Sequence, residues 1–431
     1  MISMQAIQAP AISASSTRFR VACLCAAVLL VEGYDIAAVG YVLPLLVDAW
    51  RVTPAAFTPA LAAGNIGLLL GSLIAGLLGD RFGRKPVMIA CVSSFGILSL
   101  VSAFVASPTQ LAMVRVLTGL GLGGGIPLAI ALAADFAPTI AKARFVLLAS
   151  LGIPMGFALA GFASGRLIGA FGWPAVFIAG GAAPLFLAPV LMLRLPESIV
   201  LRAAPPTPRG RVAALFRDGR ARSTALLWSI NLLNLLTTYF LLLWTPAILH
   251  DAGAGPSAAI VAATAFSLGV IASPTLMAQI IDRLGIERVL TVALAAGASC
   301  ILAIGLLDPP FALLVALVFG AGIGVGAQGG INALAALIYP PSIRATGAGW
   351  ALGFGRIGGV AGPLLGGALL AHGFSAPQIY AAAAVPAFGA MALMAVLGAC
   401  KRSDVCMDGA PYPKNADETL GGGGLTPPVQ G

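Results

Sequence analysis

The sequence predicts an all-α membrane protein, with twelve transmembrane helices arranged as two pseudo-symmetric bundles of six. Three observations indicate this fold class. The 431-residue chain is 59% hydrophobic and only 9% charged, its mean hydropathy is +1.00, and its two halves repeat each other. An average soluble protein carries about 25% charged residues, so an ordinary soluble fold is excluded. In a membrane protein the placement of the +9 net charge matters more than its sum, and we expect no nucleic-acid partner.

The predicted spans are apolar runs close to or above the ~20 residues that a membrane-crossing helix needs. They cover residues 21–47, 55–79, 86–106, 109–134, 144–170, 174–193, 223–249, 256–281, 288–307, 309–338, 344–371 and 376–399. The longest gap, 195–222, is rich in proline and arginine, as expected of a solvated linker. We therefore expect a disordered arm at 1–17, six-helix bundles at 18–194 and 223–399, and a disordered tail at 400–431.

Basic residues predict the orientation of these spans. Connections after even-numbered spans are rich in Lys and Arg, whereas those after odd-numbered spans carry almost only Arg51. Because cytoplasmic loops collect basic residues, we expect a multi-pass protein of the cytoplasmic (inner) membrane with both termini in the cytoplasm. The six cysteines have no Cys-x-x-Cys spacing, and no metal or catalytic set stands at membrane depth. We expect no disulfide, metal, cofactor or enzymatic activity.

The two halves repeat at an offset of 202 residues, which places Glu32 opposite Asn234 and Asp35 opposite Thr237. Transporters with internal repeats bind their substrates near the bilayer midplane, at the repeat interface. The level of the first-span acids is polar in both halves. A central cavity at this level is the expected result.

Glu32 and Asp35 lie in the middle of the first apolar run, and their spacing of three residues puts both on one helix face. An ionised acid at helix centre costs ~2.5–3.5 kcal/mol on insertion scales and usually faces a cavity, a partner or a proton path. Arg115, in the fourth span, is within reach of Asp35. We interpret these three residues as a proton-coupling group, and a purely structural ion pair between helices is the alternative.

Arg356 lies ~18 Å into the eleventh span and so close to the midplane. Because a guanidinium matches a carboxylate with two parallel hydrogen bonds, we predict that Arg356 anchors an organic anion. The alternative is that its charge locks the span to a neighbour. Further candidates for substrate binding are the polar and aromatic residues Asn234, Tyr239, Gln328, Asn332 and Trp350. Interhelical hydrogen bonding and packing are the alternatives for these residues.

Two motifs suggest a family. The run from Gly79 to Pro86 resembles the signature that the major facilitator superfamily carries between its second and third helices. The run from Glu32 to Asp35 is similar to the first-helix motif of its aromatic acid/proton symporters, although many members have Asp where Glu32 stands. The resemblance implies alternating access and proton-coupled uptake of a small aromatic carboxylic acid of the benzoate, hydroxybenzoate or phenylpropionate type, with the proton gradient as energy source.

The resemblance also implies a cytoplasmic latch that opens as the two halves rock. The candidate gating residues are Asp80, Arg81, Arg84, Asp135, Arg144, Asp282 and Arg283. The expected partners are the aromatic carboxylate, protons and the lipid bilayer, and the sequence favours a monomer. Two alternatives stay open: a proton-driven efflux antiporter of the same fold and a non-transporting sensor of the same ligand.

Overall fold

The computed structural model describes residues 11–137, 149–197, 212–307, 309–340 and 343–408. Within these residues, twelve helical spans are long and apolar enough to cross a membrane, which confirms the predicted fold class. The first half contains α1 (Ala11–Trp50), α2 (Thr58–Phe82), α3 (Arg84–Ser102), α4 (Pro108–Phe136), α6 (Gly152–Phe171) and α7 (Pro174–Arg194). The second half contains α9 (Ala221–Asp251), α10 (Pro256–Ala278), α12 (Ile286–Leu306), α13 (Phe311–Val325), α14 (Gln328–Ile338), α15 (Arg344–Ala371) and α16 (Ala376–Asp408). Short helices η1 (Pro54–Phe57) and α11 (Ile281–Leu284) precede α2 and α12.

The internal repeat is visible in the helix starts. α3 begins at Arg84 and α12 at Ile286, which is the predicted offset of 202 residues. The glycine before each of these helices, Gly83 or Gly285, has a positive φ of 103° or 80°. Glycine adopts this conformation without the steric cost that a side chain would add. The same sharp turn therefore connects the second and third helices of each half.

Both ends of the helical region differ from the expected boundaries. α1 begins at Ala11, inside the segment expected to be a disordered arm, and α16 continues to Asp408, beyond residue 400. Hydropathy marks only the part of a helix that crosses lipid, and a helix continues past it wherever the sequence tolerates helical backbone. Residues 1–10, 198–211 and 409–431 lie outside the described part of the chain.

The tenth span, expected as one helix over 309–338, is interrupted. α13 ends at Val325, α14 starts at Gln328, and the intervening Ala327 N–H donates to the carbonyl of Gly324 at 3.1 Å. Glycine is a poor helix former, and this run has a glycine at every second position from 320 to 326. The tighter turn places Gln328 at the first position of a new helix.

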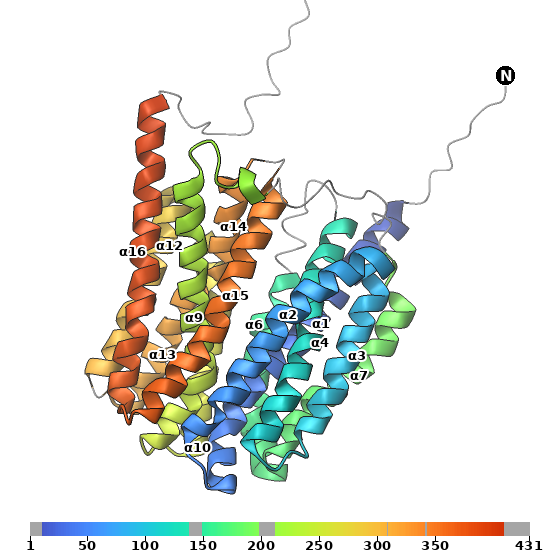
Figure 1. Ribbon diagram of the computed structural model, residues 1–431, viewed down its shortest axis with the longest axis vertical. Coiled ribbons are helices and arrows are strands. Elements are labelled where there is room, and N and C mark those ends of the chain that lie inside the picture. The colour runs from blue at the N-terminus through green and yellow to red at the C-terminus, as the bar shows by residue number, and fades with distance from the viewer. Residues whose placement is uncertain (1–10, 138–148, 198–211, 308, 341–342, 409–431) are drawn as a thin grey trace, which may run out of the picture.

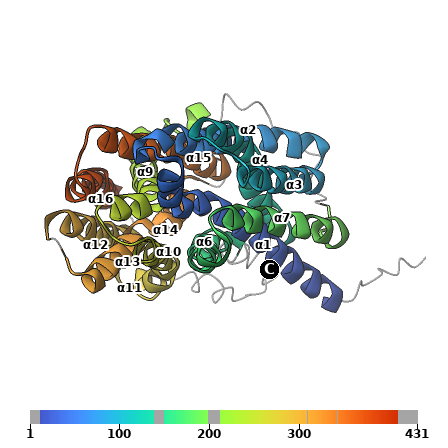
Figure 2. The same cartoon turned by 90° about the horizontal axis from the view of Figure 1, so that it is seen from below.

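The two halves meet at one end of the molecule. We call the end of the molecule at which α1 begins and α16 finishes the terminal end (Figure 1). The opposite end is the far end. At the far end the Tyr41 hydroxyl lies 3.4 Å from Ser267 Oγ, and Asp48 lies 3.4 Å from His250. α6 packs on α10 and α2 on α15 (Figure 2). The ribbons of the two halves diverge toward the terminal end.

The outer surface of the helices is apolar. Large hydrophobic side chains such as Phe104, Phe186 and Leu193 are exposed around it. A water-soluble monomer rarely exposes contiguous apolar patches of more than a few hundred Å², whereas lipid tails solvate them. The few charged side chains at membrane depth lie inside the molecule instead, and they define the site described next.

Candidate functional site

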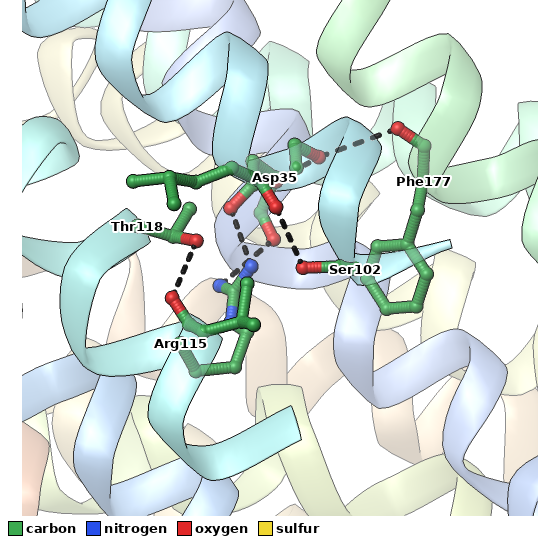
Figure 3. Close-up of polar contacts among 8 residues, drawn as sticks. Asp35, Ser102, Arg115, Thr118 and Phe177 are labelled. Carbon is green, nitrogen blue, oxygen red and sulfur yellow. Dashed lines mark hydrogen bonds and ion pairs between the residues drawn. The ribbon is translucent and has the colours of Figure 1, made fainter. Parts of the chain in front are cut away.

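Asp35, in the middle of α1, is the centre of a buried ion pair. Arg115 of α4 donates from Nη1 to Asp35 Oδ2 at 2.7 Å, and both side chains are almost fully buried (Figure 3). Ser99 of α3 donates its hydroxyl to the other carboxylate oxygen at 2.7 Å. Two neighbouring helices thus compensate the charge of Asp35, which is the condition under which a buried ion is tolerated. The predicted approach of Arg115 to Asp35 is confirmed.

Glu32 lies one turn before Asp35 in very different surroundings. It is fully buried, and neither carboxylate oxygen has a hydrogen-bond partner among the described residues. Its Oε1 occupies the space that a side chain at Gly125 of α4 would fill. The charges that act on it through space are those of Arg356 and Asp35. The two acids of α1 therefore lie on one helix face but differ in their hydrogen bonding.

Arg356 of α15 is half-buried and donates from Nη1 to the Tyr239 hydroxyl of α9 at 3.1 Å. No carboxylate within the described ranges forms an ion pair with it. Asn65 of α2 lies near Tyr239, beside Gly359 of α15. A Cβ added at Gly359 would be 3.3 Å from the Tyr239 ring and 3.6 Å from Asn65 Oδ1. Arg356 thus lies between the two halves, and its hydrogen-bond partner among the described residues is the neutral Tyr239.

Four amide side chains form a network beside this group. Gln328 donates to Asn231 at 2.8 Å and to Asn332 at 2.9 Å, and it accepts from Asn234 at 2.8 Å. The helix break before Gln328 points its side chain at α9. The predicted binding residues Asn234, Gln328 and Asn332 are thus brought together, although their mutual bonds also suit the structural alternative.

Trp350 lies apart from these residues. Its ring stacks on Trp228 with centroids 5.9 Å apart, and about half of the side chain is exposed. Phe216 and Phe354 extend this aromatic cluster around Trp228. Trp350 precedes Arg356 by about 9 Å along α15 toward the terminal end. Its role in substrate binding stays a prediction.

The predicted gating residues stand at the terminal end. Arg84 of α3 forms an ion pair with Asp135 of α4, and Arg81 lies over the Phe82 ring at 5.1 Å from its centroid. Arg283 is exposed at the end of α11. Their role as a gate stays a prediction. The side chains of the other three candidates lie outside the described part: Asp80, Arg144 and Asp282.

Sequence reasoning did not find Ser99, Asn65 or Gly125. Ser99 is one of several serines in apolar runs, and Gly125 is one of 54 glycines. Neither residue type signals an intramembrane contact by itself. Asn65 offered a weak signal, as an amide inside the second span. Only the packing of α1 against α3 and α4 singles out the other two.

Comparisons with known proteins fit this architecture. The Major Facilitator Superfamily model matches residues 25–247 and 227–414. The gallate transporter of Pseudomonas putida is 36% identical over 398 residues, covering 85% of this chain and 89% of that protein. The 4-hydroxybenzoate transporter PcaK of Pseudomonas aeruginosa is 33% identical over 423 residues, covering 90% of this chain and 94% of the relative.

Among solved structures, the D-xylose–proton symporter superposes with a TM-score of 0.70 at 17% identity, over 87% of this chain and 97% of that one. This chain belongs to the Major Facilitator Superfamily and, within it, to the family of these aromatic acid transporters. It is a multi-pass membrane transporter and not an enzyme.

Proposed function

We propose that this protein is a proton-coupled symporter that takes up a small aromatic carboxylic acid of the benzoate, hydroxybenzoate or phenylpropionate type. The names of its relatives support the substrate class, since gallate and 4-hydroxybenzoate are both aromatic carboxylates. The basic connections support an inner-membrane protein whose terminal end lies on the cytoplasmic side, because cytoplasmic loops collect Lys and Arg. With the halves packed at the far end, the described conformation then faces inward.

The observation that carries the proposal is the guanidinium of Arg356. It is half-buried between the two halves and bonded only to a neutral tyrosine among the described residues. A cation in low dielectric strongly favours a counter-ion, and a planar guanidinium binds a carboxylate in a bidentate geometry. If Arg356 served only to lock α15 to a neighbour, an acidic partner on that neighbour would be expected. The partner proposed here is the substrate.

Energetics favour coupling to a proton. An anion that enters a cell against a negative interior loses ~2.3 kcal/mol per 100 mV for each charge. One accompanying proton removes this cost, and each unit of pH gradient adds about 1.36 kcal/mol per proton. The candidate proton-coupling residues Asp35, Glu32 and Arg115 are almost fully buried within their helices. Rocking of the halves would expose the site alternately to each side.

The test is uptake of radiolabelled 4-hydroxybenzoate into cells that express Arg356→Ala. Loss of a charge-assisted, bidentate contact of about 1.5–3 kcal/mol predicts a ten- to hundredfold loss of apparent affinity. Arg356→Lys should recover part of it, because Lys keeps the charge but not the fork. Arg166→Ala, an exposed arginine of α6, is the control and should transport normally. Normal uptake by Arg356→Ala would contradict the proposed anchor.

The direction of transport is tested in membrane vesicles. A symporter accumulates 4-hydroxybenzoate in right-side-out vesicles when the outside is acidic, and a protonophore abolishes the accumulation. An efflux antiporter would instead accumulate it in inverted vesicles with an acidic interior. Binding without accumulation in either preparation would indicate a sensor and would overturn the transport proposal.

A further inference from the structure

The two acids of α1 differ in how their charge is compensated. Asp35 accepts hydrogen bonds from Ser99 and from Arg115, and its ion pair is closed from solvent. Glu32 is equally buried and has no hydrogen-bond partner among the described residues. An uncompensated buried carboxylate takes up a proton rather than remain charged. Two donors thus compensate a charge on Asp35, whereas a charge on Glu32 would be uncompensated in the described arrangement.

We propose that Glu32, and not Asp35, carries the coupled proton, and that ionised Glu32 competes with the substrate carboxylate for the single guanidinium of Arg356. This inference rests on the proposed function and assigns its coupling step to one residue. Asp35 and Arg115 then form a fixed pair that holds α1 against α4 throughout the cycle.

The surroundings of Glu32 support this division. The ionisable groups close enough to act on it electrostatically are Asp35 of its own helix, Arg356 of α15 and Cys91 of α3. The α4 neighbour is Gly125, which carries no charge, and Arg115 of α4 is already engaged by Asp35. Within the described part of the chain, Arg356 is therefore the cation left for an ionised Glu32.

Competition for one cation couples the two ligands. Whenever Glu32 is ionised in the substrate-free carrier, it pairs with Arg356, and the described arrangement, in which Glu32 has no hydrogen-bond partner among the described residues, corresponds to its protonated form. A substrate carboxylate that binds Arg356 displaces Glu32, which takes one proton from water: Glu32–COO⁻ plus H⁺ gives Glu32–COOH. Charge and atoms balance, because one anion and one proton enter together. By linkage, each ligand then strengthens the binding of the other, and loss of the substrate returns the proton on the opposite side.

The experiment compares Glu32→Gln with Asp35→Asn in proteoliposomes, with radiolabelled 4-hydroxybenzoate as probe. Glutamine imitates the protonated acid. Glu32→Gln should lose concentrative uptake, with an accumulation ratio of about one, yet keep substrate exchange. Above the pH at which Glu32 ionises, wild-type affinity should fall roughly tenfold per pH unit for one linked proton, and Glu32→Gln affinity should not. Asp35→Asn should lose both activities, because Arg115 is left buried and unpaired.

Two results would overturn the inference. One is protonophore-sensitive accumulation by Glu32→Gln, and the other is pH-independent exchange by Asp35→Asn, which would make Asp35 the proton carrier. Insensitivity of wild-type uptake to the protonophore would instead defeat the proposed function itself. The two failures are therefore distinguishable. Asp251→Asn, an exposed acid at the far end of α9, is the control and should behave as wild type.

Infrared spectroscopy of the purified protein gives a readout that does not depend on transport. At a pH below that at which Glu32 ionises, the C=O stretching band of a buried carboxylic acid should be present in wild type and absent in Glu32→Gln. Asp251→Asn should keep the band. A band that persists in Glu32→Gln and disappears in Asp35→Asn would overturn the assignment.

Discussion

At the scale of single residues, the site depends on what surrounds each carboxylate rather than on the carboxylate itself. Glu32 and Asp35 are three residues apart on one face of α1, and both are fully buried. Ser99 and Arg115 donate hydrogen bonds to Asp35, whereas Glu32 has no hydrogen-bond partner in the part of the chain that the structure describes. Removing one partner of a buried pair costs more than the pair contributes, because the remaining charge is uncompensated.

Ser99→Ala tests the hydroxyl that supports Asp35. The variant leaves one carboxylate oxygen without its donor, so a loss of about 1–3 kcal/mol of stability is expected. Thermal unfolding in detergent, with 4-hydroxybenzoate uptake measured in parallel, checks the result. Ser94→Ala, an exposed serine of the same helix, is the matched control. Equal unfolding temperatures for the two variants would show that the Ser99 contact contributes nothing.

At the scale of helices, α1 approaches α6 through residues without side chains. Gly33 lies between the two acids in sequence, and a Cβ there would collide with the carbonyl of Ile153 in α6. Gly156 of α6 meets the carbonyl of Leu30 in the same way. Small residues let membrane helices pack closely. The contact with α6 therefore leaves the acids directed at α3 and α4.

Gly33→Ala should separate α1 from α6 and destabilise the protein by about 1–3 kcal/mol, the usual cost of overpacking. Since α1 carries both acids, uptake should fall together with the unfolding temperature. Gly76→Ala in α2 is the control, because a Cβ there meets nothing within 4 Å. An unchanged unfolding temperature for Gly33→Ala would mean that the two helices adjust without cost.

At the scale of the whole molecule, the halves are joined at the far end. The Tyr41–Ser267 contact and the Asp48–His250 pair both connect the first half to the second. A surface pair of this kind contributes only about 0–1 kcal/mol even when its histidine is protonated, so it does not prevent the halves from separating. Alternating access requires that these contacts separate when the site opens to the other side.

A cross-link across the far end should trap the transporter. Asp48→Cys and His250→Cys, introduced after the six native cysteines are replaced, are treated with a short bifunctional thiol reagent that a reductant cleaves. Uptake should stop on cross-linking and return on reduction, and each single-cysteine variant should continue to transport. Undiminished uptake by the cross-linked protein would show that the far end does not open during transport.

Much of the architecture was predictable. Twelve spans, the 202-residue repeat and the depth of Glu32, Asp35 and Arg356 follow from hydropathy and spacing, which are local properties. The interrupted tenth span was not predicted, because an apolar run alone cannot reveal a break that its glycines allow. For the same reason, the helical ends beyond the lipid-crossing segments were missed.

The sequence by itself determined that this chain crosses a membrane twelve times and carries acids and arginines within the spans. The free-energy cost of placing a residue in lipid depends mainly on that residue's own side chain, so a local pattern is enough to predict it. Only the tertiary structure decided which arginine Asp35 engages, that Glu32 has no hydrogen-bond partner among the described residues, and where the halves close. These contacts join residues from 64 to 226 positions apart in the chain. They depend on how whole helices pack, which no local pattern specifies.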